Sequence, residues 1–90
     1  MINTKKFEDK YNELILVVEN EIKMVDKGVS KRSSQQLKTI VHDMDKMNEF
    51  RDAKLYAPSF PRFIVDSWDY NDSLGIELLK LFEMYKRMKS

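Results

Sequence analysis

The chain has 90 residues, which is enough for one domain with a single modest core and leaves no room for a second. It contains no cysteine and one histidine, which excludes disulfides, thiolate metal sites, cysteine nucleophiles and multi-histidine metal sites. The 16 basic and 15 acidic residues give a net charge of +1, which argues against a dedicated polyanion binder. Two glycines are too few for either common phosphate-binding loop.

The N-terminal residues carry no targeting signal, because the sequence becomes charged before any apolar run reaches signal-peptide length. The longest apolar run, Leu14 to Val18, is far shorter than a bilayer span. We therefore expect a cytoplasmic protein that makes no membrane contact. The lysine-rich, methionine-rich and glycine-poor composition is typical of a bacterial or phage protein.

Residues 4–27 are expected to form the first main helix, because apolar side chains recur there at spacings of three and four. The members of this stripe are Phe7, Tyr11, Leu14, Ile15, Val18, Ile22 and Val25. Leu16, Val17 and Met24 lie outside the stripe, which indicates that more than one partner element, or a second subunit, covers this helix. Gly28 follows at a position typical of a left-handed C-terminal cap.

Residues 31–51 are expected to form the second main helix. Ser33 to Gln36 match a capping box, in which the Ser33 hydroxyl binds a free amide and Gln36 reaches back; Ser30 is an alternative cap. The expected buried stripe is Leu37, Ile40, Val41, Met44 and Met47. The charged residues between them, Asp43 included, are assigned to the wet face or its margins.

Residues 52–71 form a connection that holds half of the aromatic residues and both prolines. Because proline disfavours helix at the preceding residue, Ala57 and Phe60 are expected to be extended or turning. Residues 62–68 fit either a short helix or a short extended strap, and we favour the helix.

Residues 72–89 are expected to form the third main helix, after a stretch rich in N-cap residues from Asp69 to Asp72. Its stripe is Leu74, Leu78, Leu81, Tyr85 and Met88, widened by Ile76, Leu79 and Phe82. The sequence therefore predicts an all-α fold: one domain, residues 1–90, built as a small bundle of three main helices with an aromatic connection.

The polar residues do not assemble a convincing catalytic or metal site. His42 has Asp45 and Glu49 on the same helix face, but a catalytic zinc site normally needs a second histidine. Aligning Asp69 with the start of a calcium loop places Leu74 where glycine is required and Lys80 where glutamate is required. We expect no catalysis, no cofactor and no bound metal.

The aromatic connection is the main candidate for a protein-binding surface. It concentrates residue types that anchor protein interfaces, namely Tyr56, Phe60, Arg62, Trp68 and Tyr70. The alternative is that these rings have only a structural role and are buried against the three main helices. Our interpretation is a small protein-binding module, such as a regulator, adaptor, inhibitor or immunity-type protein.

A nucleic-acid-binding regulator is the alternative function. The Gly28–Val29–Ser30 turn resembles the glycine turn of helix-turn-helix proteins. The residues after it that suit contacts to phosphates and bases are Lys31, Arg32, Gln35 and Lys38. The match departs where Lys27 is charged and Ser34 is polar, so a plain helical hairpin is preferred.

Self-association into a twofold homodimer is a further expectation. A three-helix monomer of this size has difficulty covering all its apolar side chains, and a dimer hides such a patch with one self-complementary surface. The side chains in question are Leu16, Val17 and Met24 in the first helix and Ile76, Leu79 and Phe82 in the third.

Overall fold

A computed structural model describes residues 4–88 of the chain, and within them it contains four helices and no strand. The helices are α1 (Thr4–Asp26), α2 (Ser34–Phe50), α3 (Phe60–Ser67) and α4 (Ser73–Lys86). The all-α fold is confirmed, with the short extra helix inside the connection. The expected end of the third main helix at residue 89 lies outside the described residues, and α4 itself ends at Lys86.

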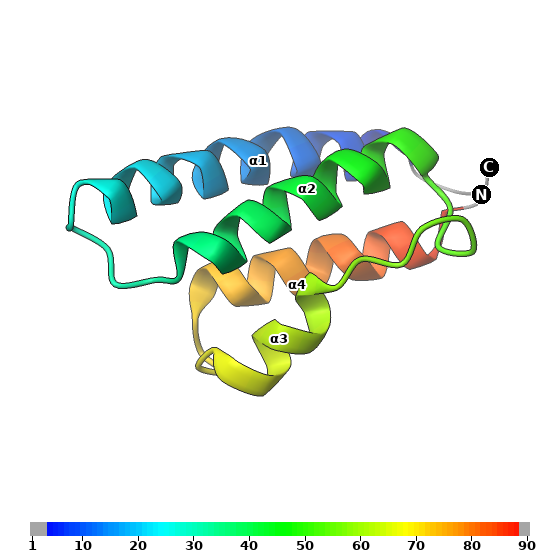
Figure 1. The fold of residues 1–90 in the computed structure, drawn as a ribbon. Coiled ribbons are helices and arrows are strands. Elements are labelled where there is room, and N and C mark those ends of the chain that lie inside the picture. Colours follow the sequence, from blue (N-terminus) through cyan, green and yellow to red (C-terminus); the bar gives the residue numbers. More distant parts are fainter. Residues whose placement is uncertain (1–3, 89–90) are drawn as a thin grey trace.

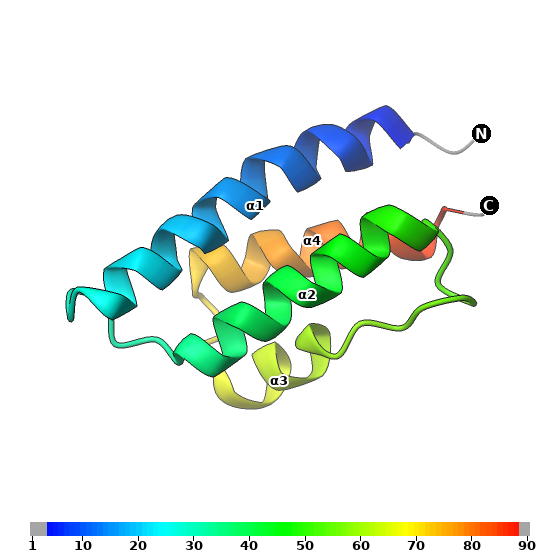
Figure 2. The ribbon, with the colours of Figure 1, turned by 45° about the horizontal axis from the view of Figure 1, so that its top comes forward.

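The three long helices lie alongside one another, and the short helix α3 packs beside α2 and α4 (Figures 1 and 2). α1 runs antiparallel to both α2 and α4, because the link through α3 returns the chain to the end where α2 began (Figure 1). The molecule measures 42 × 23 × 21 Å. None of the helices between residues 4 and 88 combines the length and the apolar character needed to cross a bilayer.

The core forms where the expected apolar stripes of the long helices meet. It is completed by two residues of α3, Phe60 and Ile64. The side chains that are fully buried are Phe7, Val18, Leu37, Ile40, Met44, Met47, Phe60, Leu78, Leu81 and Tyr85. Leu16 and Val17, which lie outside the stripe of α1, are exposed.

Local hydrogen bonds set the ends of the helices. The Ser33 hydroxyl accepts the Gln36 amide at 3.2 Å, so α2 begins after Ser33 and not after Ser30. The Gln36 side chain does not reach back as expected; its Oε1 accepts Trp68 Nε1 at 2.9 Å. Gly28 has a φ of 77°, which confirms the left-handed turn after α1.

The start of α3 differs from the expectation in two ways. Phe60 is the first helical residue and not an extended one, because Pro61 lies in the first turn, where its missing N–H needs no partner. Asp43 does not lie on the wet face of α2: its side chain is buried and faces the connection. Its Oδ2 accepts the amides of Ser59 and Phe60 at 2.9 and 3.0 Å, which fixes where α3 begins.

Candidate functional site

The structure separates the five residues expected to bind a partner. Phe60 is fully buried, with its ring edge-on to Phe82 at 6.3 Å between centroids, so it is a core residue. Arg62 and Tyr70, in contrast, are almost fully exposed, with 91% of the Arg62 side chain and 94% of Tyr70 accessible to solvent. These two residues alone of the five are open to a partner over most of their surface.

Tyr56 and Trp68 are partly buried, and their polar atoms bind other residues of the chain. The Tyr56 hydroxyl donates to Asp43 Oδ1 at 2.5 Å. Burial, together with this hydrogen bond to a carboxylate, raises the pKa of Tyr56 to about 12. Trp68 Nε1 donates a hydrogen bond to Gln36, and the Arg32 guanidinium lies over the Trp68 ring, 4.8 Å from its centroid. Both side chains hold the connection against the helices.

The residues expected to contact nucleic acid differ in their surroundings. Lys31, Gln35 and Lys38 are exposed, whereas Arg32 is engaged within the fold. Its two terminal nitrogens donate to Asp72 at 2.7 and 3.0 Å, and its Nε donates to Glu21 at 3.0 Å. The hydrogen bond with Asp72 raises the pKa of Arg32 and lowers the pKa of Asp72. Two carboxylates therefore neutralise the central cation of this set.

The residues around His42 are spread over the surface of α2. Asp45 accepts the Tyr11 hydroxyl at 3.0 Å, and Glu49 lies 3.7 Å from Lys46. Within residues 4–88, no three histidine or acidic side chains converge as metal ligands would. Asp72, the last residue of the stretch that was expected to be rich in N-cap residues, caps α4 by accepting the amides of Leu74 and Gly75.

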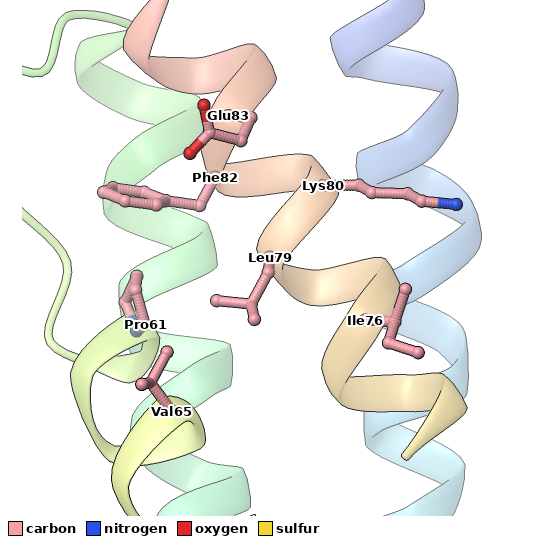
Figure 3. Close-up of a pocket in the computed structure, with 7 residues that line it drawn as sticks. All are labelled: Pro61, Val65, Ile76, Leu79, Lys80, Phe82 and Glu83. Atoms are coloured by element: carbon pink, nitrogen blue, oxygen red, sulfur yellow. The ribbon is translucent and has the colours of Figure 1, made fainter. Parts of the chain in front are cut away.

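An open apolar groove lies between α3 and α4, with a volume of about 430 Å³ (Figure 3). Its lining residues are Pro61, Val65, Ile76, Leu79, Lys80, Phe82 and Glu83. Pro61 and Val65 come from α3, and the side chain of Leu79 on α4 points toward them (Figure 3). Lys80 and Glu83 are the charged members of this lining, so the groove offers apolar contact with one base and one acid.

The separation between α3 and α4 is set by a glycine on α4 near the end of α3 and by two aromatic rings near its start. A Cβ at Gly75 would lie 3.1 Å from Trp68 and 3.3 Å from Ile64, so glycine lets the end of α3 close against α4 without displacing these two side chains. Near the start of α3, the rings of Phe60 and Phe82 lie between the two helices instead. The groove therefore has walls that are fixed from within the core.

The sequence pattern identified the apolar residues of one wall of this groove, the one formed by α4. Ile76, Leu79 and Phe82 were expected to need covering because they widen the apolar face of α4. Pro61 and Val65 were missed. The sequence does contain a signal for these two residues. Phe60 and Ile64 are four residues apart and face the core, so Pro61 and Val65, each one position further along the helix, point toward the rim of the groove.

Comparison of the chain with protein-family models, with curated proteins and with solved structures finds no match in any of the three.

Proposed function

We propose that this chain is a small, non-catalytic protein-binding module and that its binding surface is the groove between α3 and α4. The observation that carries the proposal is the exposure of apolar side chains along the groove. Val65 on α3 is 69% exposed and Ile76 on α4 is 39% exposed, with Leu79 and Phe82 between them only partly buried. A contiguous apolar surface of this kind marks a site of association in a small globular protein.

The chemistry of the groove favours a polypeptide over a small molecule. Small-molecule sites place several convergent polar groups within an apolar pocket to fix the orientation of the ligand. Here the polar groups are Lys80 and Glu83, which belong to one helix and already pair with Glu77 and Lys86. Apolar side chains of another chain satisfy such a surface without further polar contacts.

We assign two further exposed residues to the binding surface. Arg62 follows Pro61 on α3, and Tyr70 lies in the link between α3 and α4. Arginine and tyrosine are among the side chains that contribute most to binding at protein interfaces. The expected aromatic site is thus redrawn: Arg62 and Tyr70 stay in it, Phe60 leaves it, and the groove supplies its apolar centre.

Site-specific photo-crosslinking tests this function directly. A benzophenone amino acid replaces Val65 in the groove or, as a control of matched exposure, Leu16 on α1, which is 67% exposed. We expect position 65 to give a defined crosslinked protein whose mass and contact peptide are read by mass spectrometry, and Val65→Asp to abolish binding to that protein. Equal crosslinking from both positions, or binding unchanged by Val65→Asp, would contradict the proposal.

A further inference from the structure

We infer that the polypeptide that occupies the α3–α4 groove is a second copy of this chain, related by a twofold axis. This inference rests on the proposed function, since it names the partner of the same surface. A twofold dimer buries the same patch on both copies, so the patch must complement itself in shape and in charge.

The apolar part of the groove meets this requirement. Val65 on α3 and Ile76 on α4 are both exposed, and the side chain of Leu79 points from α4 toward α3, whereas Ile76 lies on the other side of α4 (Figure 3). Each copy therefore supplies both the protruding side chains and the depression that receives them. The pairing removes Val65 and Ile76 from water on both chains. Because each contact occurs twice in a twofold dimer, the total apolar area buried is twice that of a single contact.

The charged part of the groove also complements itself. Lys80 and Glu83 lie three residues apart on α4, so an approach of two α4 helices can place each lysine beside the glutamate of the other copy. Their present pairs, Lys80 with Glu77 and Glu83 with Lys86, are exposed contacts within one helix and are readily exchanged. With a net charge of +1 per chain, two copies do not repel at long range.

Insertion of another exposed apolar position into the groove would not give a closed dimer. Insertion of Leu16 or Val17 of one copy into the groove of another would join two different surfaces. Such a contact closes into a ring or continues into a filament, rather than stopping at two chains. Pairing of the groove with the groove of a second copy ends assembly at a dimer.

The oligomeric state tests the inference. Sedimentation equilibrium of the full chain is expected to give twice 10.8 kDa at high concentration. Val65→Asp should give 10.8 kDa under the same conditions, and Leu16→Asp should leave the dimer intact. Both positions are exposed, so far-UV circular dichroism should show unchanged helix content in both variants.

An exchange of charges identifies the contact itself. Lys80→Glu leaves two acids on the rim and Glu83→Lys leaves two bases, so each variant alone should dimerise more weakly by about tenfold or more. An equimolar mixture of the two variants should form a heterodimer, because every acid then faces a base. Native mass spectrometry, with one variant labelled with nitrogen-15, separates the hetero pair from the two homo pairs.

Three results would overturn the inference: a wild-type chain that stays monomeric at every concentration, a dimer lost in Leu16→Asp but not in Val65→Asp, or a mixture that forms no heterodimer. The proposed function is distinguished by the crosslinking experiment. A monomeric wild type that crosslinks from position 65 to a different protein removes the second copy as partner and leaves the groove as the binding surface.

Discussion

The Tyr56 hydroxyl donates a 2.5 Å hydrogen bond to the buried carboxylate of Asp43, 13 residues earlier in the chain. The other oxygen of the same carboxylate accepts the hydroxyl of Ser59 at 3.1 Å and the amides of Ser59 and Phe60. One acidic side chain on α2 therefore holds the connection and the first turn of α3. Because α3 is one wall of the groove, the position of that wall depends on Asp43.

Removal of the Tyr56 hydroxyl is expected to destabilise the fold. Tyr56→Phe leaves Asp43 without one of its donors, at a cost of about 1–3 kcal/mol in the free energy of unfolding. Urea denaturation followed by circular dichroism measures this loss. Tyr70→Phe, at an exposed tyrosine, is the control and should not change the midpoint. Equal stability of the two variants would show that the contact contributes nothing.

The same hydroxyl predicts a response to alkaline pH. The pKa of Tyr56 is about 12 in the fold against an ordinary value of 10.0, so the unfolded chain loses this proton first. The stabilisation is complete below pH 10 and is lost as the pH rises toward 12. Tyr56→Phe should therefore lose less stability than the wild type across this range, measured by thermal melts at a series of pH values.

Acid should weaken the contact between Arg32 and Asp72. The hydrogen bond from Arg32 lowers the pKa of Asp72 below its ordinary value of 3.8. The stabilisation is therefore present above that value and is lost as the pH falls through the folded pKa. Asp72→Asn keeps an N-cap residue but removes the ion pair, and should cost about 1 kcal/mol at neutral pH.

The acid dependence distinguishes this ion pair from a simple cap. Stability of Asp72→Asn should fall less steeply below about pH 4 than that of the wild type, as measured by urea denaturation at each pH. Asp66→Asn is the control, because Asp66 is exposed and lies 3.8 Å from Arg62. A parallel decline of Asp72→Asn and wild type would contradict the assignment.

Trp68 and Tyr70 should separate structural from binding roles. Trp68 packs on Gly75 and Arg32, so Trp68→Ala is expected to lower the free energy of unfolding by about 3 kcal/mol, near the lower end for a ring that is only partly buried. Tyr70→Ala should change stability by less than about 0.5 kcal/mol. Thermal melts of both variants test this expectation. If Trp68→Ala is as stable as the wild type, the Trp68 ring does not support the fold and becomes a candidate binding residue.

A side chain at Gly75 should push α3 away from α4. Gly75→Val places methyl groups against Trp68 and Ile64, where even a Cβ is in tight contact, at a cost of about 1–3 kcal/mol. Lys38→Val introduces the same residue at an exposed helical position on α2, outside the groove, and controls for helix propensity. The near-ultraviolet circular dichroism of Trp68 should change in the first variant and not in the second.

The helices and their buried stripes were predictable because spacings of three and four carry the information locally. Asp43 was not recognised as buried, although it lies three residues after Ile40 and four before Met47 and so falls within the same arc. Its burial depends on donors from Tyr56, Ser59 and Phe60, which only the folded chain brings to it.

The candidate site was predictable on one wall only. Ile76, Leu79 and Phe82 lie on a long helix, where surplus apolar residues stand out from the stripe. The other wall depends on where an eight-residue helix begins and how it packs, which is decided by Asp43 and by the absence of a side chain at Gly75. Pairwise contacts of this kind leave no periodic signal in a single sequence.

The shortness of α3 has a consequence for local order. Eight residues are too few for a helix to persist alone in water, so the helical amides of α3 are protected from exchange with solvent only while it stays docked. Opening of this one segment therefore costs less free energy than global unfolding of the three long helices. If a chain binds in the groove as proposed, it would hold α3 in place, and we expect hydrogen exchange to slow at residues 63–67 before it changes at the centre of α1.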